Sequence, residues 1–225
     1  MTRIGVITFP GSLDDRDAVI GIERCGGGTV PLWHADHDLQ DVDAVVLPGG
    51  FSYGDYLRTG AVAQHAPIMD EVRRFAAEGG PVLGICNGFQ ILCEAGLLPG
   101  ALLRNDGLRF VCREVDVVVE STSAWTSGLD AGTRLRLPVK HGEGRYHADD
   151  DTLDGLEGEG RVLFRYAAGQ NPNGSARDIA GIVNETGNVV GLMPHPEHAV
   201  DGELVGGTDG RHLFESVLRH LAVGV

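Results

Sequence analysis

The stretch that most constrains the fold of this chain is a short apolar run that passes through a cysteine into a helical pattern. Residues 82–85 form the kind of apolar run that is typical of a strand covered on both faces. Beyond Cys86, the apolar side chains of Phe89, Leu92 and Cys93 follow the spacing of a helix that packs back on a sheet. The sequence therefore predicts a buried strand that turns sharply into a helix at Cys86.

Glycines flank this cysteine two residues before and two residues after it, as Gly84-x-Cys86-x-Gly88. The same spacing occurs in Gly-x-Ser-x-Gly elbows, where it relieves crowding and exposes the middle side chain. The positive end of the following helix and its unpaired N–H groups would favour the thiolate form of a nucleophile. A buried structural cysteine before a glycine-containing helix start is the alternative interpretation, because free cysteines are commonly buried.

Strand patterns alternate with helix patterns along the first half of the chain. Apolar runs at residues 4–9, 29–33 and 43–47 precede the run that leads to Cys86, and amphipathic stretches separate several of them. This order predicts an α/β fold of three layers, in which a mostly parallel open sheet carries helices on both faces, as in flavodoxin-like proteins. No linker or repeat divides residues 1–225, so we expect a single domain.

The glycine-rich segment 49–55 follows the third predicted strand. Because ligands bind at the carboxyl ends of parallel strands, this segment and Cys86 should face one crevice. A glycine N–H of this segment, together with the N–H of Asn87, could bind an oxyanion there. A glycine-rich surface turn would have the same composition.

Composition excludes several classes of function. The chain carries a net charge of −14 and contains a single lysine, Lys140, which argues against a broad basic surface for nucleic acid or for an anionic membrane. The four cysteines lack metal-binding spacing, the N-terminus does not resemble a signal peptide, and no apolar run is long enough to span a bilayer. We therefore expect a soluble protein of the reducing cytosol, with Cys25, Cys93 and Cys112 in the core.

The second half of the chain has a different character. Residues 110–120 and 134–139 resemble antiparallel strands added to the sheet. Residues 140–146 interleave charged and aromatic side chains with glycine, which is typical of a functional loop, although a solvated turn can have the same composition. The acidic, glycine-rich residues 149–160 are predicted to form a solvated loop.

The candidate partners of Cys86 lie near the C-terminus. His195 follows an apolar strand and sits between two prolines, and Glu197 is two residues further on. Glu197 could accept a hydrogen bond from one ring nitrogen of His195 while the other ring nitrogen faces the thiol. These residues could instead bind a metal together with His198, but His-x-Glu-His lacks the helical spacing of zinc motifs. A structural histidine in a proline-rigidified turn is a third interpretation.

Taken together, residues 84–90 and 194–197 resemble the signature pair of the class I glutamine amidotransferases, whose triad is cysteine, histidine and glutamate. Residues 50–55, 141–146 and 170–175 are similar to segments of those members that act as glutaminase subunits in purine biosynthesis. The resemblance covers nearly the whole chain, including the triad positions.

The resemblance implies an amide hydrolysis in which the ammonia is retained. Cys86 would attack the side-chain amide of glutamine, His195 would transfer the proton, and Glu197 would orient the imidazole. By the same resemblance, the amides of Gly50 and Asn87 would form the oxyanion hole, and Gln90 would help to bind glutamine.

The resemblance also implies partners. The ammonia would pass to a separate synthetase subunit that uses ATP and magnesium to convert a ribonucleotide amide to its amidine, and a further small subunit would complete the complex. This chain would bind no cofactor or metal itself, since it has no phosphate-binding loop. Three alternatives stay open: a glutaminase for another synthetase, a cysteine amidohydrolase that acts alone, and a non-catalytic subunit on the same fold.

Overall fold

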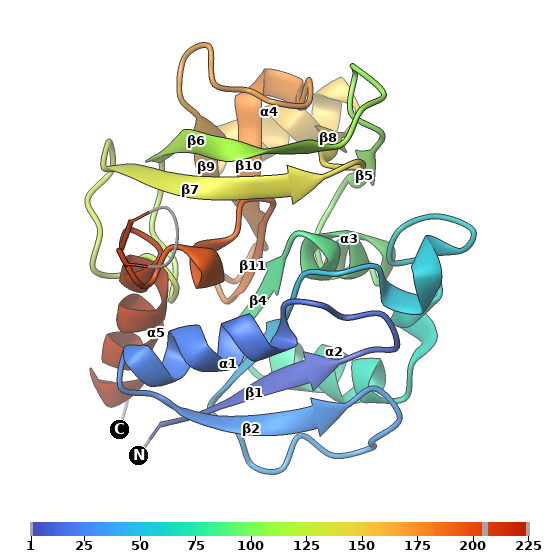
Figure 1. Cartoon of the computed structure of the whole chain (residues 1–225), viewed down its shortest axis with the longest axis vertical. Helices are drawn as coiled ribbons and strands as arrows, with labels where there is room; N and C mark the ends of the chain where they lie inside the picture. The colour runs from blue at the N-terminus through green and yellow to red at the C-terminus, as the bar shows by residue number, and fades with distance from the viewer. Residues whose placement is uncertain (1, 204–206, 224–225) are drawn as a thin grey trace.

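The computed structural model describes residues 2–203 and 207–223 and shows one large sheet with helices on both of its faces (Figure 1). The strands of this sheet, in spatial order, are β2 (Gly28–Trp33), β1 (Arg3–Thr8), β3 (Ala44–Leu47), β4 (Val82–Ile85), β11 (Val189–Leu192), β10 (Ile179–Val183), β9 (Val162–Tyr166), β6 (Val111–Val119) and β7 (Arg134–His141). Two short strands, β5 (Ala101–Leu103) and β8 (Arg145–His147), form a separate antiparallel pair.

The five strands from β2 to β11 run parallel, and the four that follow pair antiparallel with their neighbours. Helices α1 and α5 lie on one face of the parallel strands, and α2 and α3 lie on the other (Figure 1). The helices are α1 (Asp15–Arg24), α2 (Ile68–Ala77), α3 (Asn87–Glu94), α4 (Asp150–Gly158) and α5 (Arg211–Val223). This arrangement confirms the predicted three-layer fold with added antiparallel strands.

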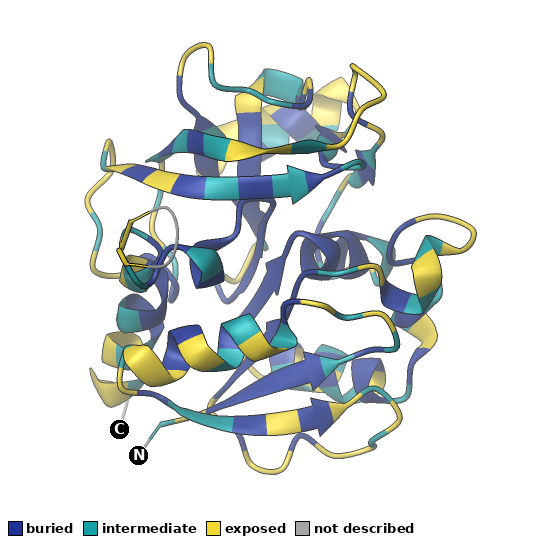
Figure 2. Ribbon diagram, viewed as in Figure 1, coloured by how far each residue is buried: buried dark blue, intermediate teal, exposed yellow. Residues whose placement is uncertain are grey.

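Burial follows directly from this layering. Every residue of β3, β4 and β11 is buried, because helices cover these strands on both faces. Figure 2 shows the buried residues concentrated in the central strands, while exposed residues lie on the outer sides of the helices. Within the described ranges, no helix has the length and apolarity that crossing a membrane requires.

The parallel order brings four strand ends to one edge of the sheet. The chain leaves β1, β3, β4 and β11 at their carboxyl ends and enters the segments that contain Asp14, Gly50, Cys86 and His195. These four residues come from distant parts of the sequence, and they line a common pocket. The pocket therefore lies at the edge of the sheet where we expect ligands to bind.

Two local predictions were wrong. Residues 149–160 are not a solvated loop, because α4 forms there with Asp149 as its N-cap, whose side chain accepts a hydrogen bond from the Thr152 amide at 2.8 Å. Acidic residues favour a helix N-terminus, and Leu153 and Leu156 bury one face of this helix. Cys112 is exposed on β6 rather than in the core.

Candidate active site

The turn from β4 into α3 is a strained elbow with Cys86 at its apex. Cys86 has φ 49° and ψ −101°, which L residues adopt rarely and mainly where surrounding structure holds them. A side chain at Gly84 would approach the backbone of Gly88 to 2.6 Å, and one at Gly88 would collide with the carbonyl oxygen of Leu47. The two glycines therefore allow β3, β4 and α3 to pack closely enough to place the thiol at the strand ends.

The two backbone amides expected to form an oxyanion hole belong to Gly50, which lines the pocket, and to Asn87, which follows Cys86. Asn87 is the first residue of α3, so its N–H has no partner within the helix. The Gly49 carbonyl accepts hydrogen bonds from the amides of Leu13 and Asp14, both at 3.2 Å, so the Gly50 N–H of the same peptide unit points away from these residues. Gly50 has φ +147°, and a side chain there would meet the backbone of the 11–13 segment within 2.8 Å.

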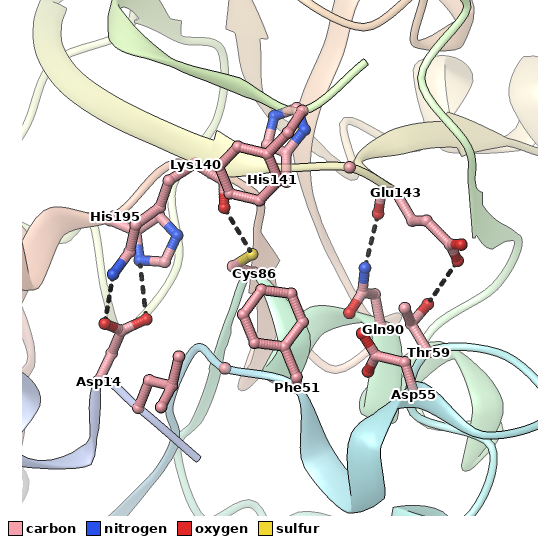
Figure 3. Close-up of a pocket in the computed structure, with 14 residues that line it drawn as sticks. Asp14, Phe51, Asp55, Thr59, Cys86, Gln90, Lys140, His141, Glu143 and His195 are labelled. Carbon is pink, nitrogen blue, oxygen red and sulfur yellow. Dashed lines mark hydrogen bonds and ion pairs between the residues drawn. The ribbon is translucent and has the colours of Figure 1, made fainter. Parts of the chain in front are cut away.

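His195 and Glu197 form a buried pair beside the cysteine. The Nδ1 atom of His195 lies 2.5 Å from Oε1 of Glu197, and neither residue is appreciably exposed. The Nε2 atom has no protein partner in the described part of the chain, and His195 and Cys86 line the same pocket (Figure 3). Burial alone would lower the pKa of His195, but the charges on Glu197 and Cys86 raise it to about 10.

A second carboxylate lies against this histidine. Asp14 Oδ2 is 3.7 Å from His195 Nδ1, and Asp14 Oδ1 accepts a hydrogen bond from His198 at 3.2 Å and another from Lys140. Burial would raise the pKa of Asp14, but the hydrogen bond from His198, the charge on His195 and the contact with Lys140 hold it well below its usual range.

Sequence reasoning missed Asp14 as a functional residue. Asp14 does occupy the N-cap position of α1, but its side chain makes no capping hydrogen bond and turns toward His195 instead. Asp14 follows the carboxyl end of β1, and ligands of parallel sheets bind at the carboxyl ends of the strands. This position in the sequence could have identified Asp14.

The carboxylates and histidines also offer ligand atoms for a metal. Among the described residues, those of Asp14, His195, Glu197 and His198 lie within 4.8 Å of one another, and Cys86 is not part of the group. A cation there would have to displace the Lys140 ammonium from Asp14 and the proton shared by His195 and Glu197. The donor set therefore fits an oriented imidazole better than it fits a metal centre.

Gln90 connects the elbow helix to the loop after β7. Its Oε1 accepts a hydrogen bond from the Asn87 side chain at 2.9 Å, and its Nε2 donates to the Glu143 backbone oxygen at 2.6 Å. Asn87 in turn accepts from the Ser52 amide at 3.1 Å. Gln90 thus lines the pocket and also ties together three of the segments that form it.

The segment that the sequence singled out as a loop, residues 140–146, is a loop only at residues 142–144, because its ends belong to β7 and β8, and residues 140–143 form one wall of the pocket. His141 is buried, with Nδ1 3.1 Å from the Asn105 side-chain oxygen and Nε2 3.4 Å from the Asn173 side-chain nitrogen. Burial, followed by the charge on His195, lowers the pKa of His141 to about 4, so this ring is neutral near pH 7. His141 therefore supports the loop through hydrogen bonds, and the same network involves the 170–175 segment.

The pocket itself has a volume of about 240 Å³. Beyond the residues described above, it is lined by Leu13, Phe51, Asp55, Thr59, Phe110, Gly142 and Glu143. In Figure 3, His195 and Asp14 lie on one side of the pocket, Cys86 lies in the middle, and Gln90, Asp55, Thr59 and Glu143 lie on the other side. The sequence predicted the segments that carry Asp55 and Glu143, but it did not predict that these two carboxylates share one end of the pocket.

Comparison with known proteins agrees with this geometry. Residues 1–207 match the model of the CobB/CobQ-like glutamine amidotransferase domain. The chain is 63% identical over 217 residues to phosphoribosylformylglycinamidine synthase subunit PurQ of Nocardia farcinica, covering 96% of each protein. It is 61% identical over 223 residues to the subunit of the same name in Mycobacterium tuberculosis, covering 99% of each. Among solved structures, a chain of PurLQS from Thermotoga maritima superposes with a TM-score of 0.89 at 45% identity, covering 98% of this chain and 99% of that one.

Proposed function

Because this chain belongs to the glutamine amidotransferase family, we infer that it is the glutaminase subunit of a phosphoribosylformylglycinamidine synthase of purine biosynthesis. The relatives of that name match nearly their whole length. The observation that carries the catalytic part of this inference is the buried His195–Glu197 pair in the pocket of the Cys86 elbow.

We propose that Cys86 attacks the side-chain carbonyl carbon of glutamine. Because the pKa of His195 is raised to about 10, its Nε2 already carries the proton of the Cys86 thiol before the attack, and this imidazolium donates the proton to the leaving nitrogen. The carbon–nitrogen bond breaks, ammonia leaves, and a thioester to Cys86 remains. A water molecule, deprotonated by His195, then cleaves the thioester to release glutamate.

Glu197 and the two backbone amides would support both steps. The hydrogen bond from Nδ1 of His195 to Glu197 fixes the tautomer and stabilises the imidazolium that forms. The amides of Gly50 and Asn87 would stabilise the oxyanion, and each such donor typically contributes about 3 to 4 kcal/mol in the transition state. Gln90 would hold the substrate from the opposite end of the pocket.

The ammonia would pass to a synthetase subunit that converts formylglycinamide ribonucleotide to the amidine with ATP and magnesium. A further small subunit would complete the complex. We propose that the whole of residues 1–225 acts as one glutamine amidotransferase domain that binds no cofactor or metal itself. The reducing cytosol is the proposed compartment, because all four cysteines are unpaired.

The test is the substitution Cys86→Ala in the chain assembled with its synthetase. Synthesis from glutamine should be lost, whereas synthesis from added ammonium should survive, because the synthetase step does not use the thiol. Cys112→Ala is the matched control, since Cys112 is exposed on β6 and should leave both activities intact. Loss of both activities in an assembled Cys86→Ala complex would refute this division of labour.

A further inference from the structure

The side chain of Asn87 lies between the two segments whose amides we assign to the oxyanion hole. Asn87 is the first residue of α3 and is 1% exposed. Its Oδ1 atom accepts a hydrogen bond from the amide of Ser52 at 3.1 Å, and its Nδ2 atom donates to Oε1 of Gln90 at 2.9 Å. Ser52 is also buried and follows Gly50 by two residues. This asparagine therefore joins the Gly50 segment to the helix that begins after Cys86.

The orientation of the Asn87 side-chain amide is fixed by its neighbours. A main-chain N–H can only donate, so the atom of Asn87 that faces Ser52 must be the oxygen. The nitrogen of Asn87 then faces Gln90, whose own Nε2 donates to the backbone oxygen of Glu143 at 2.6 Å. Since a backbone oxygen can only accept, neither side-chain amide can flip without placing two donors or two acceptors against each other.

The segment that follows Gly50 does not hold its shape through favourable backbone angles. Tyr53, Asp55 and Leu57 have φ values of 53°, 55° and 71°, a region that residues other than glycine rarely adopt. Such conformations persist only where the surrounding structure imposes them. The position of this segment therefore depends on its contacts with neighbouring parts of the chain.

Main-chain hydrogen bonds attach this segment to the loop after β1. The amides of Phe51 and Tyr53 donate to carbonyl oxygens of that loop at 2.9 Å and 2.6 Å. In the described part of the chain, the bond from Ser52 to Asn87 is the one hydrogen bond that joins residues 50–57 to α3. Without it, the segment would be tied to the loop after β1 but not to the helix that carries the second amide.

We propose that Asn87 is, through its side chain, a positioning residue for the oxyanion hole: its bond to Ser52 sets where the Gly50 amide lies relative to the Asn87 amide. This assignment rests on the proposed function, because it takes these two amides as the donors to the oxyanion of glutamine hydrolysis. The donors belong to different segments, so both can point at one oxyanion only if the segments keep a fixed separation. Asn87 would thus act twice, through its main-chain N–H and through a side chain that does not touch the substrate.

The test compares two reactions of Cys86 in the chain assembled with its synthetase. Hydrolysis of glutamine passes through an oxyanion, whereas alkylation by iodoacetamide displaces iodide from a saturated carbon and forms no oxyanion. Asn87→Ala keeps the main-chain amide and removes the side-chain bonds. We expect kcat for glutamine hydrolysis to fall by about tenfold to hundredfold, because the donor is displaced but not removed. The rate of alkylation should stay within about twofold, because it depends on the thiolate.

Asn188→Ala is the matched control. Asn188 is 6% exposed, and its Nδ2 donates to the backbone oxygens of Ala76 and Gly80, both at 2.8 Å. It precedes β11, at the end of the sheet away from the pocket, so its replacement should lower the melting temperature without changing kcat. An unchanged kcat in Asn87→Ala, equal losses of hydrolysis and alkylation in that variant, or a similar loss of kcat in Asn188→Ala would overturn the proposal.

A second variant separates the two hydrogen bonds of Asn87. Gln90→Met removes the partner of the Asn87 nitrogen and leaves the bond from Ser52 in place. We expect it to raise KM for glutamine, since Gln90 lines the pocket, and to lower kcat less than Asn87→Ala does. A loss of kcat as large as that in Asn87→Ala would assign the effect to Gln90 and overturn the proposal.

Hydrogen exchange tests the bond in the unsubstituted chain, whether or not the variants fold. The Ser52 amide should exchange at least about tenfold more slowly than in an unstructured peptide. Exchange at the unstructured rate would mean that Asn87 does not hold this amide, and the proposal would fail. If the unsubstituted complex did not hydrolyse glutamine, the proposed function would fail; if it did and Asn87→Ala matched it, only this assignment would fail.

Discussion

Replacing Asp14 by asparagine should lower the pKa of His195 by roughly one to three units, because it removes a negative charge that lies against the imidazole. The asparagine side chain would have nearly the same shape and could still accept hydrogen bonds from Lys140 and His198. The substitution therefore tests the charge of Asp14 and leaves its packing almost unchanged.

The magnitude follows from the distance of 3.7 Å between Asp14 Oδ2 and His195 Nδ1. At an effective dielectric constant of about 20, two unit charges at this separation attract by about 4 kcal/mol. One pKa unit corresponds to about 1.36 kcal/mol, so the upper limit is about three units. The Lys140 ammonium, which contacts the same carboxylate, offsets part of this attraction. The pKa of His195 should therefore fall from about 10 to between roughly 7 and 9.

The assay is an NMR titration of the chain with labelled histidine rings, in which the His195 signal is assigned by its absence from His195→Gln. Asp15→Asn is the matched control, because the neighbouring Asp15 accepts a hydrogen bond from Thr8 and does not line the pocket. A shift smaller than about half a unit in Asp14→Asn, well below the Coulomb estimate, would refute the electrostatic coupling. A shift of similar size in Asp15→Asn would refute its specificity.

Two further predictions concern stability. A methyl group at Gly88 would collide with the Leu47 carbonyl, so Gly88→Ala should lower the free energy of unfolding in urea by about 1 to 3 kcal/mol. In α4, a methyl group at Gly155 meets nothing within 4 Å, so Gly155→Ala should raise the free energy of unfolding by about 0.5 to 1 kcal/mol. Equal effects of the two substitutions would contradict this steric explanation. The pKa of His195 is about 10 in the folded state and 6.5 in the unfolded state, because Glu197 stabilises the imidazolium. This interaction therefore stabilises the fold fully below pH 6.5, and its contribution is lost as the pH rises through 10. Between pH 6.5 and pH 10, the urea midpoint should therefore fall less in Glu197→Gln than in the unsubstituted chain. A larger fall in the variant would contradict a stabilising interaction between Glu197 and the His195 imidazolium.

The features that the sequence predicted best are those that obey local rules. A strand pattern precedes Cys86 and a helix pattern follows it. The glycines around Cys86 avoid steric collisions, as the close approach of Gly88 to the Leu47 carbonyl shows. His195 and Glu197 are two residues apart, so their hydrogen bond depends mainly on one turn. Because these strands run parallel, the segments that follow them lie at one edge of the sheet, and no further sequence signal is needed to predict this.

The features that the sequence did not predict depend on contacts between distant segments. Lys140 and Asp14 meet across 126 positions, and no local pattern links the end of β7 to the loop after β1. Helix α4 was missed for a different reason: its acidic residues were taken as a sign of solvation, whereas at a helix N-terminus the same charges are favourable.

Asp14 and Asp55 show why distant contacts also decide chemistry. Both are pocket carboxylates, yet their pKa values move in opposite directions because their surroundings differ. Asp14 gains a histidine, a lysine and the charged His195, so it stays ionised and can stabilise the imidazolium. Asp55 gains burial and a second carboxylate, so its ionised form is disfavoured and its pKa rises to about 6. The same residue type therefore carries a stable negative charge beside His195 and a more readily protonated group beside Glu143, and contacts between distant segments decide which.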